Sequence, residues 1–281
     1  VVLGPGRSTG QAVIDGGDYV CFTGSTPTGR RVAESASKRL VGYSLELGGK
    51  NSVYIADNAD LGRAVDGAVR SCFASAGQLC ISTERVLVHE GIYDRFVPAF
   101  VEKVKALRLG TALEYGYDMG SLVSQEQLET VTQHVEDAVA KGATLLAGGK
   151  ARPDLGPFVF EPTVLTDVSS AMLCRDEETF GPVVSIYRVS DDDAAVALAN
   201  DTEYGLASYV FTKDQARMYR VAESIEFGLM GYNVGVISNP AAPFGGVKQS
   251  GLGREGGAEG IEEYTSVQYI GIADPWAATK A

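Results

Sequence analysis

Histidine and cysteine are scarce in this sequence, which has two histidines and four cysteines among its 281 residues. The cysteines form no Cys-x-x-Cys pair, so a zinc site is not expected and no metal ligand is predicted. A low cysteine content favours a reducing compartment over a disulfide-bonded secreted fold, and we therefore expect a cytoplasmic protein.

Basic residues are also few: the sequence has 24 Lys and Arg residues against 36 Asp and Glu residues, which gives a net charge of −12. Nucleic acids and anionic membrane surfaces are bound through clustered basic residues, so neither is an expected partner. No apolar run reaches the roughly 18 to 20 residues of a membrane span. The chain starts without Met in the apolar stretch VVLGPG, and we expect a fragment or a processed chain.

Strand-like apolar stretches alternate with helical patterns along most of the chain, which predicts an α/β fold with a parallel sheet flanked by helices. Strands are expected at residues 18–24, 43–49, 51–56, 84–89, 144–149, 183–190, 207–212, 228–234 and 264–272. Helices are expected at residues 29–40, 60–77, 91–107, 124–143, 191–200 and 213–225. The glycine-rich stretch 239–260 fits neither element and is expected to be a functional loop.

Two glycine-rich stretches near the start invite a nucleotide-binding interpretation. GPGRSTG, at 4–10, misses the dinucleotide fingerprint by one residue and is interpreted as a turn. GSTPTGRR, at 24–31, has P-loop glycine spacing but Arg-Arg where Lys-Ser/Thr is required, so a Walker A site is rejected. The expected strand-to-helix turn at Gly24 still points free N–H groups toward any nearby anion, and the glycine permits close approach of a ligand.

Glu46 and Cys80 are the two residues with the clearest chemical potential. Glu46, within LELGGKN, is either an outward-facing charge or a desolvated carboxyl whose raised pKa suits a general base. Cys80, within GQLCIST, is either a small buried hydrophobe or a nucleophilic thiolate. Glu177 and Glu178 would point in opposite directions in an extended chain, so only one of them can face a given site.

The stretches FTGS, LELGGKN, GQLC, EETFGPV and PFGG-K-SG-GRE-G follow one another in this order, and together they resemble the aldehyde dehydrogenase superfamily. The interval of 34 residues between Glu46 and Cys80 makes the resemblance specific, and it covers essentially the whole chain. It implies the C-terminal part of a Rossmann-like cofactor domain in 1–48 and a catalytic domain in 49–250. A return segment and oligomerisation strand are implied for 251–281.

The same resemblance implies the roles of individual residues. Cys80 would attack a small-molecule aldehyde, the resulting thiohemiacetal would pass hydride to NAD or NADP, and Glu46 would activate the water that hydrolyses the thioester. Contacts with the cofactor are implied for Gly24, Ser25, Leu47, Glu178 and Phe180. A dimer or tetramer is implied for the full-length enzyme. Because an upstream oxyanion asparagine and the adenine-ribose segment are missing, we expect little activity from this chain alone.

The substrate is implied less directly, through a likeness to the succinate-semialdehyde branch of the family. Ser238 stands where that branch helps to hold the distal carboxylate of the substrate. Ala74 stands where the branch often has an arginine, so the positive charge would come from Arg70 or from an arginine outside the chain. Other aliphatic aldehydes therefore stay open as substrates.

Two other classes of function also stay open. Cys80 with His89 would make a cysteine hydrolase that needs no cofactor, although no local motif orients that histidine. His89 and His134 are otherwise expected to be satisfied surface or strand-end residues. The third possibility is a non-catalytic fragment that serves structure or protein contacts.

Overall fold

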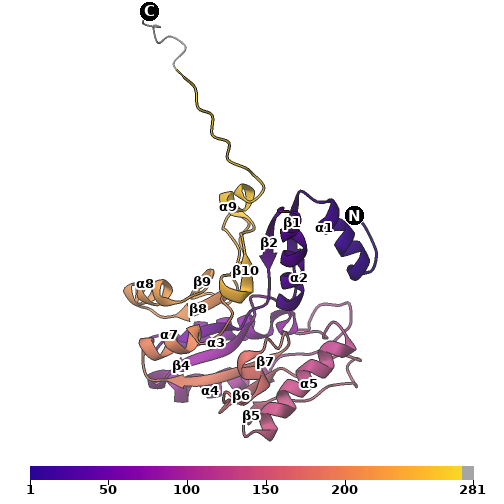
Figure 1. The fold of residues 1–281 in the computed structure, drawn as a ribbon. Helices are drawn as coiled ribbons and strands as arrows, with labels where there is room; N and C mark the ends of the chain where they lie inside the picture. The colour runs from indigo at the N-terminus through magenta and orange to yellow at the C-terminus, as the bar shows by residue number, and fades with distance from the viewer. Residues whose placement is uncertain (274–281) are drawn as a thin grey trace, which may run out of the picture.

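The computed structural model describes residues 1–273, and its main body is a mostly parallel sheet between two layers of helices (Figure 1). The strand order is β5-β6-β7-β4-β3-β8-β9, and only β5 runs antiparallel to its neighbour. The strands are β3 (Asn51–Ile55), β4 (Thr83–His89), β5 (Thr144–Ala147), β6 (Thr163–Thr166), β7 (Val183–Val189), β8 (Ala207–Phe211) and β9 (Leu229–Tyr232). The helices are α3 (Leu61–Phe73), α4 (Glu90–Lys105), α5 (Gln125–Ala140), α6 (Leu173–Asp176), α7 (Asp192–Asn200) and α8 (Gln215–Ser224).

Successive side chains of the central strands point alternately toward the two helical layers. In β3, Val53 and Ile55 join the larger core that includes α3 and α4, whereas Tyr54 joins the smaller core beneath α7 and α8. All five residues of β3 are buried, as expected for a parallel strand that is covered on both faces.

A second, smaller sheet carries the start of the chain. It consists of β1 (Tyr19–Thr23), β2 (Gly42–Glu46) and the short β10 (Gly251–Leu252), and it is packed against α2 (Thr26–Ser37). The remaining elements are η1 (Gly6–Gly10), α1 (Gln11–Gly16), η2 (Ala74–Gly77), η3 (Lys248–Ser250) and α9 (Gly257–Glu262). Because β10 is antiparallel to β2, the glycine-rich segment returns across the molecule and lies beside Glu46.

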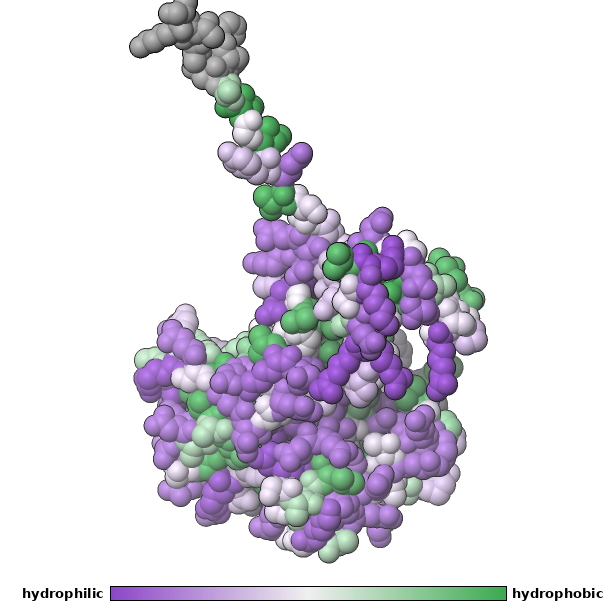
Figure 2. All heavy atoms as spheres, in the orientation of Figure 1, coloured by the Kyte–Doolittle hydropathy of each residue, from purple (hydrophilic) through white to green (hydrophobic). Residues whose placement is uncertain are grey.

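Most of the predicted elements are confirmed, including every predicted helix and the parallel sheet. The predicted strand at 264–272 is wrong, because residues 265–273 have no regular structure and project from the body (Figure 1). A strand needs a neighbouring chain to satisfy its N–H and C=O groups, and among the described residues this segment has none. This segment carries several green, hydrophobic groups in Figure 2. Val267, Tyr269, Ile270 and Ile272 are all exposed. Positions 274–281 of the predicted oligomerisation segment lie outside the described residues.

Candidate active site

One cavity of about 390 Å³ collects most of the residues that the sequence predicts to be functional. Its wall includes the ends of β1 and β2 on one side and the segment around Cys80 and the 178–180 loop on the other. Seven of the nine predicted site residues line it, namely Gly24, Ser25, Glu46, Leu47, Cys80, Glu178 and Phe180. Segments that are far apart in sequence therefore meet at a single site.

Cys80 is fixed by a tight turn and by one asparagine. The turn has positive φ at Ser75, Ala76 and Gly77, and a Cβ on Gly77 would lie 2.1 Å from the carbonyl oxygen of Gly181. Asn51, at the start of β3, donates from Nδ2 to the carbonyl oxygens of Cys80 at 2.7 Å and Ser82 at 2.8 Å. The backbone around the thiol is therefore held from both sides.

Glu46 is a buried carboxyl that is not part of an ion pair. The side chain is 4 % exposed, and within residues 1–273 neither carboxyl oxygen has a hydrogen-bond partner. Burial raises its pKa to about 8, with a further increase from Glu255 and an opposing effect of Arg254. The structure thus rules out an outward-facing charge, and a carboxyl with this pKa suits proton transfer near neutral pH.

The environment of Cys80 differs from that of the other cysteines. Cys72 and Cys174 are buried and Cys21 is exposed, whereas Cys80 is half-buried in the wall of the cavity. Burial raises the pKa of the Cys80 thiol, and the carboxyls of Glu46 and Glu178 raise it further. The resting group is therefore a thiol that needs a nearby proton acceptor to become a nucleophile.

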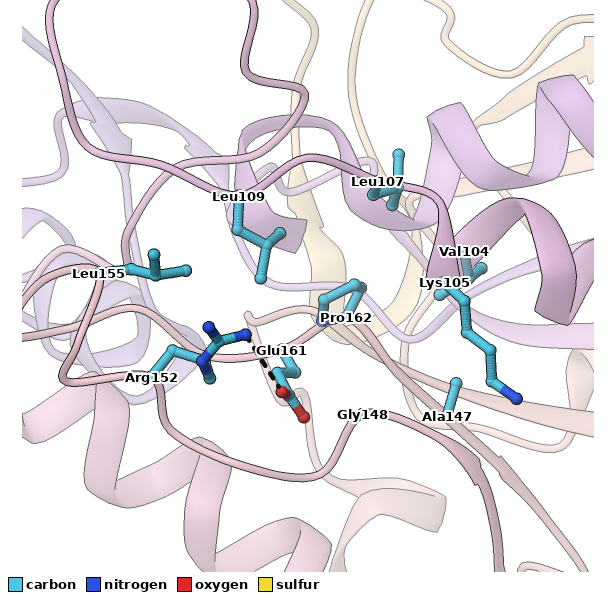
Figure 3. A pocket seen from close by; sticks show the side chains of 10 residues that line it. All are labelled: Val104, Lys105, Leu107, Leu109, Ala147, Gly148, Arg152, Leu155, Glu161 and Pro162. Carbon is cyan, nitrogen blue, oxygen red and sulfur yellow. Dashed lines mark ion pairs between the residues drawn. The ribbon is translucent and has the colours of Figure 1, made fainter.

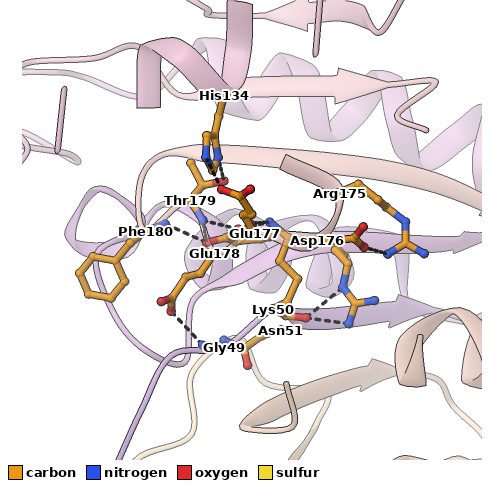
Figure 4. A network of polar contacts seen from close by, with 12 residues as sticks. Gly49, Lys50, Asn51, His134, Arg175, Asp176, Glu177, Glu178, Thr179 and Phe180 are labelled. Carbon is orange, nitrogen blue, oxygen red and sulfur yellow. Dashed lines mark hydrogen bonds and ion pairs between the residues drawn. The ribbon is translucent and has the colours of Figure 1, made fainter. Parts of the chain in front are cut away.

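Glu178 and Glu177 point in opposite directions, as predicted (Figure 4). Glu178 Oε1 accepts a hydrogen bond from the N–H of Gly49 at 2.8 Å, whereas Oε2 of Glu177 lies 3.6 Å from Nε2 of His134. Burial and the nearby Glu84 raise the pKa of Glu178 to about 7. A Cβ on Gly48 would lie 2.4 Å from Glu178 Oε2, so a larger residue there would displace the carboxyl of Glu178.

A second cavity of about 670 Å³ adjoins the first and shares Ser25 and Glu178 with it. It lies at the start of α2, whose N-cap residue Ser25 makes no side-chain capping bond. Its hydroxyl instead donates to Thr28 Oγ1 at 3.0 Å, so the first N–H groups of the helix are available to a ligand. The charged side chains of the second cavity are acidic, namely Asp176, Glu177, Glu178, Asp201 and Glu203, so among its described lining residues the start of α2 is the part that favours an anion.

Two residues that sequence reasoning missed, Lys50 and Glu84, form a buried ion pair beneath the 177–180 loop. A signal for them exists in the sequence. Lys50 follows Glu46 by four positions and Glu84 follows Cys80 by four positions, so both pairs share the interval of 34. Lys50 directly precedes β3 and Glu84 lies in β4, and the parallel pairing of these two strands brings the two side chains together.

The two predicted substrate residues lie outside the cavity of Cys80. Ser238 lines a separate cavity of about 350 Å³, with apolar neighbours that include Val236, Ile237 and Phe244, and no Lys, Arg or His among its described lining residues. Arg70 is exposed in the last turn of α3 and lines none of the cavities described here. The structure does not bring Arg70 together with Cys80.

The two histidines have structural contacts. His89 accepts from the N–H of Gly91 at 3.0 Å and caps α4, as predicted for a strand-end residue. It lies at the far end of β4 from Cys80, roughly 20 Å of strand away, so the predicted alternative of a Cys80–His89 pair is wrong. His134 is satisfied by Thr179 Oγ1 at 3.0 Å, but the surface or strand-end position expected for it is wrong, because it is buried on the inner face of α5.

A further cavity of about 400 Å³ lies beside the end of α4 and contains none of the predicted residues (Figure 3). Its charged groups are Lys105, Arg152 and Glu161, and the last two form an ion pair at 3.6 Å. No thiol or hydroxyl lies among its described lining residues, so the chemistry is assigned to the cavity of Cys80. None of the helices in residues 1–273 is long and apolar enough to cross a membrane.

A half-buried thiol, a desolvated carboxyl and a helix start without a side-chain cap thus meet at one cavity of an α/β fold. The family model of the aldehyde dehydrogenase family matches residues 1–270, and the chain belongs to this family. The predicted resemblance and the predicted fold class are thereby confirmed.

The relatives are similar over nearly the whole chain. A protein of Mycobacterium ulcerans named "Putative succinate-semialdehyde dehydrogenase", with NADP(+) in its name, is 49% identical over 97% of the chain and 53% of its own length. The "Succinate semialdehyde dehydrogenase" of Acinetobacter baylyi is 42% identical over 96% of the chain and 56% of its own length. The structure of betaine aldehyde dehydrogenase from Staphylococcus aureus in complex with NAD+ has a TM-score of 0.90 and 40% identity, over 94% of the chain and 53% of its own length. The chain thus spans about half the length of the curated relatives it matches.

The buried Glu46 predicts a pH-dependent stability. The carboxyl has an ordinary pKa of 4.5 when the chain is unfolded and a pKa of about 8 when it is folded. Only the unfolded chain loses this proton between those values, so stability falls as pH rises from 4.5 toward 8. Glu46→Gln removes this fall in stability. The difference in Tm between Glu46→Gln and the native protein should therefore increase from about pH 5 to about pH 8.

Thermal unfolding at three pH values in this range measures the gain. Glu223→Gln, at an exposed position of α8, is the matched control and should show no such trend. A gain that is constant with pH would contradict the raised pKa of Glu46.

Proposed function

We propose that the full-length protein oxidises an aldehyde to a carboxylic acid with NAD or NADP through a covalent intermediate on Cys80. The observation that carries this proposal is the meeting of Cys80, Glu46 and the predicted cofactor residues in one cavity. The names of the relatives support it, since they include dehydrogenases of semialdehydes and a structure with NAD+. Four free cysteines are consistent with the cytoplasmic location that we also propose.

The residues present fit a dinucleotide. The uncapped start of α2 offers N–H groups to phosphate, and Gly24, whose own N–H donates to the carbonyl oxygen of Glu46 at 3.0 Å, lies beside it in the cavity wall. Glu178 stands where the two cavities join and has one oxygen without a hydrogen-bond partner in residues 1–273. We assign Leu47 and Phe180 to packing against the bound cofactor, since both line the cavity beside Cys80. The cofactor itself supplies the acceptor for the hydride that leaves the substrate.

Cys80 and Glu46 divide the remaining chemistry. The thiol gives its proton to Glu46 as Sγ attacks the aldehyde carbon, and loss of hydride leaves a thioester on Cys80. Glu46 releases that proton to solvent and then takes a proton from water as the water oxygen attacks the thioester carbon. The acid leaves as Glu46 returns this proton to the sulfur of Cys80 and the thiol re-forms. A base with a pKa of about 8 can both accept and return a proton at neutral pH.

Substitutions of the two residues should have different kinetic signatures. Cys80→Ala should abolish aldehyde oxidation, because no other thiol lies in the cavity as described. Glu46→Gln should lower steady-state turnover by about 100-fold or more, because the amide cannot take a proton from water. Stopped-flow absorbance at 340 nm should still show a burst of reduced cofactor in Glu46→Gln, slower than in the native enzyme because Cys80 must then give its proton to solvent, and this burst marks acylation without deacylation.

Cys21→Ala is the control, since Cys21 is exposed and outside the cavity of Cys80. It should retain the turnover of the native enzyme. Unchanged turnover in Glu46→Gln would exclude Glu46 as the base.

We propose succinate semialdehyde as the substrate, in preference to neutral aliphatic aldehydes. The cavity of Ser238 is mostly apolar and offers this hydroxyl as a donor to the distal carboxylate. We infer that the matching positive charge comes from outside residues 1–281, because Arg70 is exposed and lines none of these cavities.

The ratio of kcat/KM for succinate semialdehyde and butyraldehyde tests this assignment. Ser238→Ala should lower the preference for the acid by roughly 10-fold, since hydrogen bonds to charged groups contribute about 1.5 to 3 kcal/mol. Arg70→Ala should leave the ratio unchanged. A ratio near one in the native enzyme would show that the carboxylate is not recognised.

We also propose that residues 1–48 belong to the cofactor domain, 49–250 to the catalytic domain and 251–281 to a return segment that mediates a homodimer or homotetramer. The exposed apolar side chains of 264–272 support the last assignment, because a second subunit would cover them and complete their backbone hydrogen bonds.

Deletion of residues 265–281 from the full-length protein should therefore reduce the size of the assembly in sedimentation velocity. A control in which this segment is replaced by a Gly-Ser sequence of equal length should behave like the deletion. An unchanged sedimentation coefficient in both would show that the subunits associate elsewhere.

A further inference from the structure

We infer that Glu84, together with Lys50, is a positioning residue that fixes the carboxyl of Glu178 in the cofactor cavity. The inference rests on the proposed function, since it assigns the purpose of the pair to the cofactor side of that reaction. Neither residue lines the cavity of Cys80, so the pair acts through the 177–180 loop.

Glu84 holds the loop on the C-terminal side of Glu178. Its side chain is 4 % exposed, and Oε1 accepts from the N–H groups of Thr179 and Phe180, each at 2.9 Å. Oε2 accepts from the same N–H of Thr179 at 3.0 Å. These are charge-assisted bonds to two consecutive peptide groups, which restrain the direction of the backbone as it leaves Glu178.

Lys50 holds the loop on the N-terminal side. It is paired with Glu84, and its Nζ also donates to the carbonyl oxygen of Glu177 at 2.7 Å. Figure 4 shows the loop wrapped around this lysine, with Glu178 directed toward Gly49. One ion pair therefore contacts the peptide groups on both sides of Glu178.

A second contact holds the same loop from α5. Gln127 donates from Nε2 to the carbonyl oxygens of Thr179 at 2.8 Å and Phe180 at 2.9 Å. Phe180 has φ of 48°, an unfavourable conformation for a side chain other than glycine, which persists only where neighbours impose it. Glu84 and Gln127 together supply partners for both N–H and both C=O groups of residues 179 and 180.

The arrangement matters because Glu178 itself has few contacts of its own. Its carboxyl makes one hydrogen bond, with the N–H of Gly49, and its remaining oxygen is directed toward the cavity. A loop that moved by one ångström would carry this oxygen away from any ligand, and misplacements of that size are costly in catalysis. Loss of the Glu84 contacts should therefore weaken cofactor binding before it affects the thiol.

Two double variants separate positioning from simple loss of a buried charge. A single substitution would leave one unpaired charge in the core and threaten the fold. Lys50→Met/Glu84→Gln removes both charges but keeps an oxygen that can accept from Thr179 and Phe180. Lys50→Met/Glu84→Met removes both charges and that acceptor, while the side-chain volumes stay similar.

In the full-length enzyme, we expect the Met/Met variant to raise the KM for the cofactor by about tenfold relative to the Met/Gln variant. Labelling of Cys80 by iodoacetamide without cofactor should stay within about twofold in the two proteins, because the thiol has its own supports at Asn51. Equal cofactor KM values in the two variants would overturn the inference, and so would parallel losses of cofactor binding and thiol labelling.

A single variant on α5 loosens the same loop without touching the ion pair; Gln127 also lines the cavity, so the double variants carry the test of Glu84. Gln127→Ala should also raise the cofactor KM several-fold, whereas Gln125→Ala on the same helix should not, because Gln125 bonds only to Glu129 at 2.9 Å. A native enzyme without cofactor-dependent aldehyde oxidation would refute the proposed function instead. Native activity with unchanged KM in all of these variants would refute only the positioning role.

Discussion

The parallel pairing of β3 with β4 is the interaction on which the candidate site depends. It aligns Asn51 with Thr83 and thereby sets the segment that follows Glu46 beside the segment that follows Cys80. Asn51 uses this proximity to bind the carbonyl oxygen of Cys80, while its own Oδ1 accepts from the N–H of Ala207 at 2.9 Å. Arg85, fully buried in β4, binds the carbonyl oxygen of Lys50 at 2.6 and 2.9 Å. The register of β3 and β4, which pairs residues 32 to 33 positions apart, thus brings the chain after Glu46 close to the chain after Cys80.

Close packing at this junction explains why glycine is needed at particular positions. Gly48 leaves room for the carboxyl of Glu178, and Gly77 lets the chain before Cys80 approach the backbone of Gly181. Each glycine loses more conformational entropy on folding than another residue would. The buried, unpaired Glu46 adds a further cost. Stability is therefore lower here than a fully apolar packing would give, which is typical of sites that hold reactive groups.

Local patterns were sufficient to predict the helices, most strands and the parallel sheet, because periodicity reports directly on burial. Local patterns drew attention to Gly24, Glu46 and Cys80, and the resemblance assigned their roles and added the other four of the seven residues that meet in the cavity. Lys50 and Glu84 were missed, since recognising the pair requires knowing that their strands are neighbours. The buried position of His134 had a signal that was overlooked: Val131, His134, Val135 and Ala138 recur at helical spacing and form the buried face of α5. The strand at 264–272 could not be judged from its composition, because a strand is defined by its partner.

The three carboxyls around Cys80 show how burial and partners assign different tasks to one chemical group. Glu84 has a cationic partner and accepts from two peptide N–H groups, so its charge is fully used in holding the chain. Glu178 accepts one hydrogen bond from a peptide N–H, and its other carboxyl oxygen has no hydrogen-bond partner in the described chain, so that oxygen can accept a hydrogen bond from a ligand. Glu46 has no hydrogen-bond partner in the described chain, and its pKa of about 8 lets it gain or lose a proton at little cost. A positive neighbour beside Glu46 would lower that pKa and favour the carboxylate, as Arg254 does in part. The placement of Lys50 beside Glu84, and not beside Glu46, therefore separates the positioning carboxyl from the one that we propose as the base.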